Sequence, residues 1–179
     1  MISSQSTQRP MRRKDRELSR EETLTVIRHT PHCVIATVDE SGTPYATPIT
    51  AVLFEGAVYF HSSSDANGRR YQNALQNDKV SIVWIGRGET AADELPKDFS
   101  VNYASAIVEG RISLVTDEGE QKRVAKAFCL RHVPQAGEEA IDKYYAAGGK
   151  YVVFWKVTID SLSGKARNKQ GYFNRILAV

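Results

Sequence analysis

The segment from residue 44 to residue 77 constrains the fold more than any other part of the chain. It has the pattern of a strand, a tight turn, a second strand and the beginning of a helix. Glu55 and Gly56 mark the turn, and Val58 and Phe60 share one face of the second strand. Two strands joined by so short a turn pair antiparallel, so we expect the chain to build an antiparallel sheet.

The junction between the second strand and the helix carries residues suited to an anion. Ser62 and Ser63 begin a run of potential helix N-caps, and Arg69 and Arg70 stand near the predicted helix start. Cations at a helix N-terminus are unfavourable unless an anion lies between them and the helix. We therefore hypothesise a phosphate site. Simple capping serines and solvated arginines are the alternative that these residues leave open.

Further runs extend the sheet. Cys33–Val38 is a predicted strand, and Lys79–Ile85 is another, followed by a predicted loop over residues 86–98. Pro48 lies inside the strand that begins the segment described above. Because proline cannot donate a ladder hydrogen bond, we expect that strand to be edge-like or bulged there.

Two long runs complete the sheet. Residues 99–115 change their buried face near Val108–Gly110, which requires a bulge or a sharp bend. Residues 151–159 alternate most regularly of all. Strands that bend and change face close a sheet into a barrel, so the predicted fold is mainly β with peripheral helices: an antiparallel six-stranded barrel.

The helices have recognisable ends. Ser19 and Glu22 have the spacing of a capping box, and the helix they begin should end before Pro31. Further helices are predicted over residues 67–77, 117–132 and 138–146. We divide the chain into a basic arm (1–18), a barrel domain (19–162) and a basic, aromatic tail (163–179). We interpret the arm as a mostly disordered segment that can settle on the surface, and the tail as solvated.

Composition limits the function classes. The 179 residues suit one domain, and a net charge of +3 is too small to indicate nucleic-acid binding, so that partner is unlikely on sequence grounds. No apolar run approaches the ~20 residues of a membrane helix, and the N-terminus lacks the apolar core of a signal peptide. Cys33 and Cys129 lie far apart, which favours reduced core cysteines and a cytoplasmic location without a membrane partner.

Strong catalytic motifs are missing from the sequence. There is no HExxH, GxSxG or P-loop pattern, the four histidines do not have metal-site spacing, and Gly86-Arg87-Gly88 lacks the third glycine of a dinucleotide fingerprint. We expect no metal site. A phosphate site beside a curved sheet, without strong catalytic side chains, is typical of a protein whose chemistry comes from a cofactor.

Three segments in order carry a family resemblance: residues 11–18, residues 42–48 with 58–62, and residues 103–111 followed by a helix that ends at 131–134. With them the chain resembles the FMN-binding split barrels related to pyridoxamine 5′-phosphate oxidase, and within these the nitroimidazole-resistance type. The resemblance implies a split β-barrel homodimer with FMN in clefts between subunits.

Carried onto this sequence, the resemblance assigns three groups of cofactor contacts. Thr47, Pro48 and Ile49 would lie along the isoalloxazine ring; Ser62, Ser63, Arg69 and Arg70 would hold the phosphate; Asn102, Tyr103 and Ser105 would reach the ring from the second subunit. His61 would contact FMN or act as a catalytic proton donor, and a structural histidine is the open alternative. Residues 63–70 are less glycine-rich than in relatives, and the C-terminus lacks the substrate signature of the true oxidases, so that substrate is not assigned.

The expected function is that of an FMN-dependent oxidoreductase. It would pass electrons, with NAD(P)H as a donor, to a small acceptor such as a nitroaromatic, a quinone or another flavin. A split barrel that holds flavin or haem without turnover is the alternative. A basic-armed RNA-binding barrel is a third reading, and it predicts binding that weakens with salt.

Overall fold

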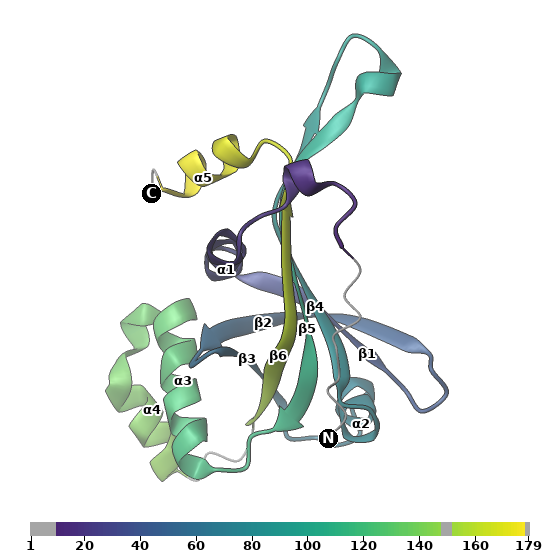
Figure 1. The fold of residues 1–179 in the computed structure, drawn as a ribbon. Coiled ribbons are helices and arrows are strands. Elements are labelled where there is room, and N and C mark those ends of the chain that lie inside the picture. The colour runs from purple at the N-terminus through teal and green to yellow at the C-terminus, as the bar shows by residue number, and fades with distance from the viewer. Residues whose placement is uncertain (1–9, 148–151, 178–179) are drawn as a thin grey trace, which may run out of the picture.

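The computed structural model describes residues 10–147 and 152–177. Six strands form a closed barrel in the order β1-β2-β3-β6-β5-β4, and all neighbours are antiparallel (Figure 1). The predicted six-stranded antiparallel barrel is confirmed. The strands are β1 (His32–Val38), β2 (Pro44–Phe54), β3 (Ala57–Ser63), β4 (Lys79–Ala91), β5 (Ser100–Leu114) and β6 (Val152–Ala166).

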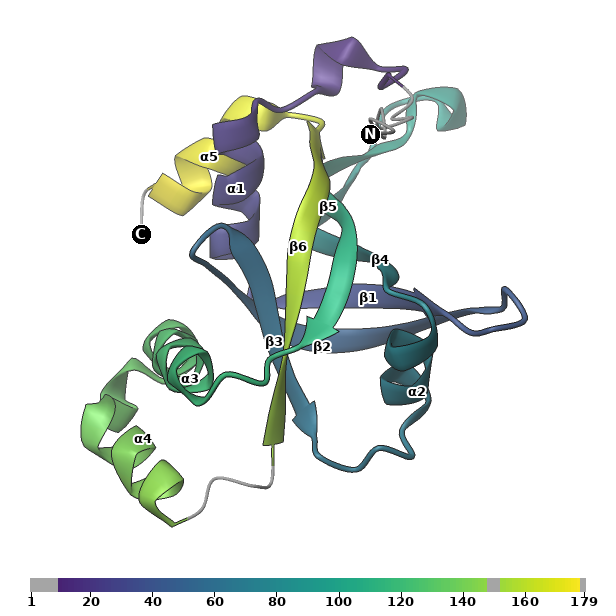
Figure 2. The ribbon, with the colours of Figure 1, turned by 60° about the horizontal axis from the view of Figure 1, so that its bottom comes forward.

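The helices lie around this barrel. They are α1 (Arg20–His29), α2 (Arg69–Gln76), α3 (Glu118–His132), α4 (Gly137–Ala146) and α5 (Lys169–Leu177), with short 3₁₀ turns η1 (Lys14–Arg16), η2 (Pro96–Asp98) and η3 (Pro134–Ala136). Figures 1 and 2 show α3 and α4 together on one side of the barrel, and α2 on the side facing away from them. No helix in the described ranges combines the length and the apolar character that crossing a bilayer requires.

The predicted capping box at the start of α1 is confirmed. The Ser19 hydroxyl accepts from the Glu22 backbone N–H at 3.2 Å, and the Glu22 carboxylate accepts from the Ser19 N–H at 2.8 Å. Two of the helix's unpaired N–H donors are thereby satisfied. The helix ends at His29, before Pro31, as the sequence predicts.

Two apolar clusters stabilise the fold. The first fills the barrel and includes Trp84, Trp155 and Phe60, which are almost fully buried. The second lies on the outer face of β2, β3 and β6, where Tyr59 and Phe154 pack under the α3–α4 pair. Helices on this side are therefore held by the outer face of the sheet and not by the barrel interior.

An irregularity occurs at Gly110, but the predicted change of buried face is wrong: even-numbered residues of β5 from Ala104 to Ile112 are all buried, and the extra residue, Asp160, is in β6. The register between β5 and β6 shifts between Glu109 and Gly110. A Cβ built on Gly110 would lie 2.1 Å from the carbonyl oxygen of Thr158, so only glycine fits between the two backbones.

Two strands are longer than the sequence predicts. β4 continues through the predicted loop to Ala91, where it pairs with the start of β5 in a hairpin that projects beyond the barrel (Figure 1). β6 continues past residue 162 to Ala166 and leads into α5, whose Tyr172 is 1% exposed. The interpretation of residues 163–179 as a solvated tail is therefore wrong for the described part, because Tyr172 packs into the first apolar cluster.

The end of the basic arm is also attached to the barrel. The Leu18 N–H donates to the Gly164 carbonyl at 3.0 Å, and Leu18 is buried. The arm is thus not solvated at its end, since backbone pairing and an apolar side chain hold it. Residues 1–9 of the arm, Tyr151 as the predicted first residue of the last strand, and residues 178–179 of the tail lie outside the described residues.

Candidate functional site

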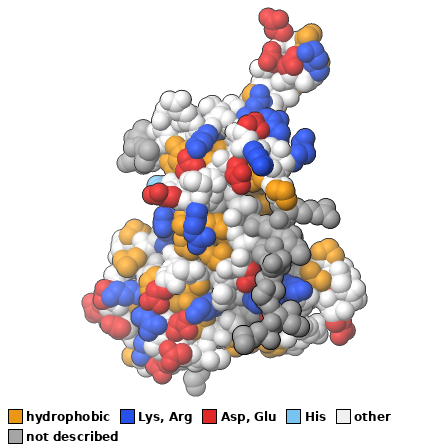
Figure 3. Space-filling model, viewed as in Figure 1, with side chains coloured by type: hydrophobic (Ala, Val, Ile, Leu, Met, Phe, Trp, Pro, Cys, Tyr) orange, Lys and Arg blue, Asp and Glu red, His pale blue; other side chains and the backbone are white. Residues whose placement is uncertain are grey.

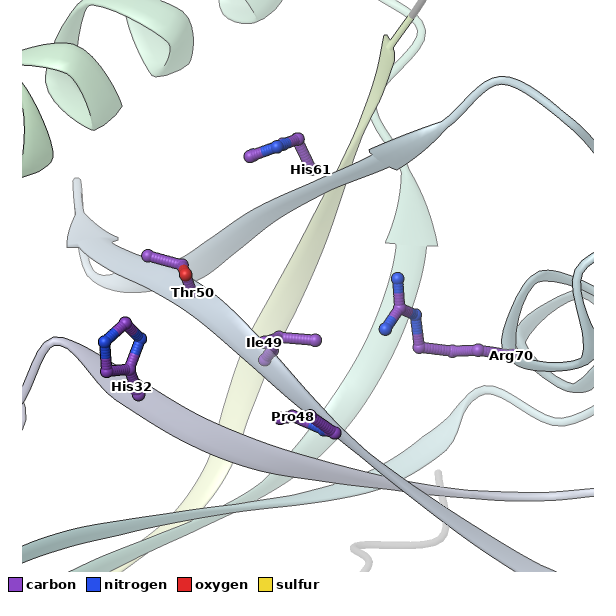
Figure 4. A pocket seen from close by; sticks show the side chains of 6 residues that line it. All are labelled: His32, Pro48, Ile49, Thr50, His61 and Arg70. Atoms are coloured by element: carbon purple, nitrogen blue, oxygen red, sulfur yellow. The ribbon is translucent and has the colours of Figure 1, made fainter.

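A pocket of about 280 Å³ opens between β1, β2, β3 and α2. Figure 4 shows the side chains that line it: His32, Pro48, Ile49, Thr50, His61 and Arg70. Four of the six, Pro48, Ile49, His61 and Arg70, belong to the predicted site. Such a volume lies near the lower end of ligand pockets, which span roughly 300–1,000 Å³.

The pocket lies where β2 and β3 separate. β2 pairs with β1 over residues 44–50 and with β3 only over residues 51–54, and β3 continues alone against β6 after Phe60. Within the described residues, the facing edges of β2 around Pro48 and of β3 around His61 therefore have no strand partner. The edge-like strand predicted from Pro48 is confirmed, and its backbone polar groups are free to meet a ligand.

Arg70 supplies the charge of the pocket. Its Nη1 donates to Thr47 Oγ1 at 3.1 Å, and its guanidinium lies over Phe60, 5.3 Å from the ring centroid. Partial burial lowers the pKa of Arg70. No carboxylate in the described ranges lies within ion-pair distance of it. A half-buried cation without a counter-charge is unfavourable by itself and favourable once an anion binds.

Arg69 lies elsewhere. Its Nη2 is 3.6 Å from the Asp39 carboxylate, and its guanidinium carbon is 4.5 Å from the Tyr45 ring centroid. Arg69 thus contacts the β1–β2 hairpin. Of the two arginines predicted to act together, only Arg70 lines the pocket.

The predicted capping role of the serines is wrong. Gly68, and not a serine, is the N-cap of α2, and no side chain caps the helix. Ser62 and Ser63 belong to β3 because they pair with β6. Ser62 Oγ accepts from Trp155 Nε1 at 3.0 Å, while Ser63 Oγ accepts from the Asp65 N–H at 3.1 Å. The first-turn N–H groups of α2 therefore have no side-chain cap, beside Arg70.

His61 extends from the free end of β3 at the wall of the pocket (Figure 4). Its ring meets Phe128 of α3 edge-on, with centroids 4.8 Å apart. More than a third of the residue is exposed, yet the aromatic neighbours screen the ring. This desolvation first, and the Arg70 charge second, lower the pKa of His61 below its ordinary value. The imidazole is therefore neutral near pH 7 and has both a donor and an acceptor nitrogen.

Asn102, Tyr103 and Ser105 are not brought to this pocket within one chain. They lie on β5 where it pairs with the outer part of β4, opposite Glu89, Gly88 and Ile85 respectively. The Tyr103 hydroxyl accepts from Arg16 Nη1 at 3.3 Å. These three residues therefore form part of a separate surface on the side of η1 and the end of β6.

Sequence reasoning missed two lining residues, His32 and Thr50. The signal that could have found them is the short turn at residues 39–42, because antiparallel pairing around it places His32 opposite Thr50. No three His, Cys, Asp or Glu side chains in the described part of the chain are arranged to hold a metal ion.

Comparisons with solved structures return the same fold. A proposed 5-nitroimidazole antibiotic resistance protein from Bacteroides thetaiotaomicron matches with a TM-score of 0.67 and 18% identity, over 83% of this chain and 85% of that one. The FAD and heme binding protein from Mycobacterium smegmatis matches with a TM-score of 0.69 and 16% identity, over 84% of this chain and 72% of that one. An FAD-binding protein from Mesorhizobium loti matches with a TM-score of 0.60 and 19% identity, over 86% of this chain and 98% of that one. No curated protein matches the chain.

The family comparison extends over most of the chain. The family described as pyridoxamine 5′-phosphate oxidase matches residues 19–166, from the capping serine of α1 to the last residue of β6. The resemblance first seen in three sequence segments is thereby confirmed. The chain belongs to the pyridoxamine 5′-phosphate oxidase family and has its split-barrel fold.

Proposed function

We propose that the chain binds FMN in the pocket beside Arg70 and, as a homodimer, transfers electrons from the reduced flavin to a small acceptor. The half-buried Arg70, which has no carboxylate partner among the described residues, is the observation that carries this proposal. The Thr47 hydroxyl and the Phe60 ring leave its charge without a counter-ion, and a phosphomonoester provides two negative charges for the guanidinium and the uncapped N–H groups of α2.

The pocket of one chain would hold part of the proposed cofactor. The phosphate would lie between Arg70 and the start of α2, and the ring would lie along the free edge of β2 at Thr47, Pro48 and Ile49. Relatives described as FAD-binding support a flavin. One arginine, Arg70, lines the pocket, which suits a single phosphate group and favours FMN in this chain. Bound flavin supplies reversible hydride and electron transfer, and the neutral His61 can donate or accept a hydrogen bond beside it.

A row of apolar residues supports the homodimer. Pro48, Val34, Val83 and Ile107 are consecutive cross-strand partners on β2, β1, β4 and β5. Val34 is 39% and Ile107 is 37% exposed. The row begins at the pocket and crosses the outside of the sheet, so a second copy covering it would also complete a cofactor site too small for FMN in one chain.

Absorption spectroscopy with two neighbouring variants tests the cofactor proposal. We expect flavin bands that persist through desalting or appear after FMN is added. Arg70→Ala should weaken FMN binding about 10- to 100-fold, because a charge-assisted hydrogen bond contributes about 1.5–3 kcal/mol. The FMN affinity of Arg69→Ala should stay within about threefold of the natural chain, since Arg69 contacts Asp39 and does not line the pocket.

Equal losses in the two variants, or unchanged affinity in Arg70→Ala, would overturn the phosphate assignment. Oxidation of NAD(P)H by the FMN-loaded protein with a nitroaromatic or quinone present then tests turnover. Tight FAD binding with weak FMN binding would show that the cofactor is FAD and not FMN.

A flavin- or haem-binding protein without turnover is the second candidate. His61 and His132 favour it: burial lowers the pKa of both, which favours neutral rings, and a relative is described as binding FAD and heme. His132 Nε2 lies 3.2 Å from the Ala51 carbonyl oxygen, so its Nδ1 would be the ligand atom. Haemin titration decides between the two. A Soret shift that His61→Ala or His132→Ala abolishes would favour this candidate, and reductase turnover without haem would exclude it.

A further inference from the structure

A second pocket, of about 300 Å³, lies between the α3–α4 pair and the outer face of β3 and β6. Figure 2 shows the two helices standing beside these strands. His61 lines this pocket as well as the pocket beside Arg70. One imidazole therefore separates a polar pocket from a second cavity, and a molecule in either would contact the same ring.

The walls of the second pocket are aromatic and aliphatic. Phe128 and Tyr144 come from the helices, and Phe154 and Val152 come from β6. None of its lining residues is Lys, Arg, Asp or Glu. Transfer of a charged group into such surroundings without a partner is strongly unfavourable, whereas a flat apolar ring gains from burial and from edge contacts with the aromatic walls.

The apolar surface of the pocket points to a ligand. The pocket is open to solvent beside the second apolar cluster, so hydrocarbon surface of α3, α4 and β6 stays in contact with water. An apolar ligand that enters the pocket buries this surface, which makes the pocket a binding site of defined chemistry.

We propose that this pocket is the acceptor subsite and that it takes uncharged aromatic acceptors of one or two rings, such as small nitroaromatics. The inference rests on the proposed function, because it places the acceptor across His61 from the flavin. The two pockets divide the ligands by charge: the anionic cofactor lies beside Arg70, and the neutral acceptor lies among Phe128, Phe154 and Tyr144.

A matched pair of ligands and a matched pair of variants test the proposal. The ligands are 4-nitrotoluene and 4-nitrobenzoate, which have similar shapes and differ by one charge. Ala140→Trp places an indole at the pocket wall from an exposed position, and Ala146→Trp makes the same change at the exposed last residue of the same helix, outside the pocket.

Ligand-detected NMR titration gives the affinities. We expect 4-nitrotoluene to bind at least about tenfold more tightly than 4-nitrobenzoate, which corresponds to about 1.4 kcal/mol. Ala140→Trp should weaken 4-nitrotoluene binding by a similar factor, and Ala146→Trp should leave it unchanged. No binding to the natural chain, equal binding in the two variants, or preference for the carboxylate would overturn the proposal; the last result would place the ligand beside Arg70.

Thiol labelling locates the ligand independently. Cys129 lines the pocket and is half-buried, whereas Cys33 is buried and its pKa is raised to about 12 by that burial. N-ethylmaleimide should therefore modify Cys129 first, and 4-nitrotoluene should slow that reaction in the natural chain and in Ala146→Trp. An unchanged rate under saturating 4-nitrotoluene would overturn the assignment.

Arg70→Ala separates this inference from the proposed function. Its FMN affinity should fall while its 4-nitrotoluene affinity and Cys129 protection stay the same. If FMN does not bind the natural chain but 4-nitrotoluene does, the cofactor proposal fails and the apolar site stands. If FMN binds and 4-nitrotoluene does not, the acceptor subsite fails and the cofactor proposal stands.

Discussion

Arg69 and Arg70 are neighbours in the sequence, yet they act in different places. Arg69 lies against Asp39 and Tyr45, and Arg70 lies over Phe60 beside Thr47. The cause is helical geometry: at 3.6 residues per turn, consecutive side chains point about 100° apart. Arg69 and Arg70 therefore leave the first turn of α2 in different directions, and only Arg70 reaches the pocket.

This separation predicts the titration of His61. Arg70 lowers the pKa of His61 because a nearby cation disfavours the protonated imidazole, and desolvation acts in the same direction. In NMR titrations of the ring protons we expect a midpoint below the ordinary value of 6.5. Arg70→Ala should move that midpoint toward higher pH, since one of the two causes is removed, whereas Arg69→Ala should leave it in place. A midpoint that is the same in all three proteins would contradict this electrostatic contact.

At this scale the sequence predicted residue types better than their partners. Arg70 and His61 line the pocket, whereas Arg69, Ser62 and Ser63 do not, and the capping box of Ser19 was correct because its contacts are local. The role of Ser62 was not predictable from neighbours along the chain. Its hydroxyl is held by Trp155, a residue of the last strand, and such long-range pairing leaves no local signal.

At the scale of elements, Gly110 allows β5 to bend around the barrel. It pairs with Val80 of β4 and with Ile159 of β6, at the point where the β5–β6 register shifts. An alanine methyl there would enter the Thr158 carbonyl, a backbone atom that moves only with its strand.

We therefore expect Gly110→Ala to lower the free energy of unfolding by about 1–3 kcal/mol or more, the cost of overpacking against a fixed backbone. Chemical denaturation monitored by tryptophan fluorescence measures it. Gly88→Ala is the matched control, because the same methyl on β4 meets no atom within 4 Å. Similar losses in both variants would show that general strand effects, and not the contact with Thr158, determine the cost.

The elements also show where apolar alternation in the sequence does not predict the limits of a strand. The face change expected in residues 99–115 is absent: even-numbered residues of β5 from Ala104 to Ile112 are buried throughout, while the odd-numbered Phe99 and Val101 lie in the projecting hairpin and are exposed. The irregularity at Gly110 is a register shift whose extra residue, Asp160, is in β6, so the apolar pattern of residues 99–115 indicated its place but not its cause. The outer part of β4, from Gly86 to Ala91, lies in a hairpin beyond the barrel and adds no side chain to the apolar core, although Arg87 is largely buried, so apolar alternation is missing there. The end of β6 was missed for a similar reason, since a register shift at the bulge interrupts its period.

At the scale of the whole molecule, the exposed row of Pro48, Val34, Val83 and Ile107 is the proposed contact between two copies. A carboxylate in the middle of such a contact would be desolvated without a partner. Ile107→Glu should therefore convert a dimer into a 20.0 kDa monomer and weaken FMN binding with it.

Light scattering after size-exclusion chromatography measures the mass, and spectral titration measures the FMN affinity. Leu130→Glu is the control, because Leu130 is 57% exposed on α3 and lies outside the row. A dimer that persists in Ile107→Glu would place the contact on another surface.

The order of the strands around the ring has a consequence for the synthesis of the protein. β3 borders β6, although α2, β4, β5, α3 and α4 all intervene along the chain. The edge that presents His61 and Ser62 is therefore unsupported until the last strand leaves the ribosome. Formation of the proposed cofactor site therefore has to wait for the last strand, and we expect a chain that ends before residue 152 not to bind the proposed cofactor.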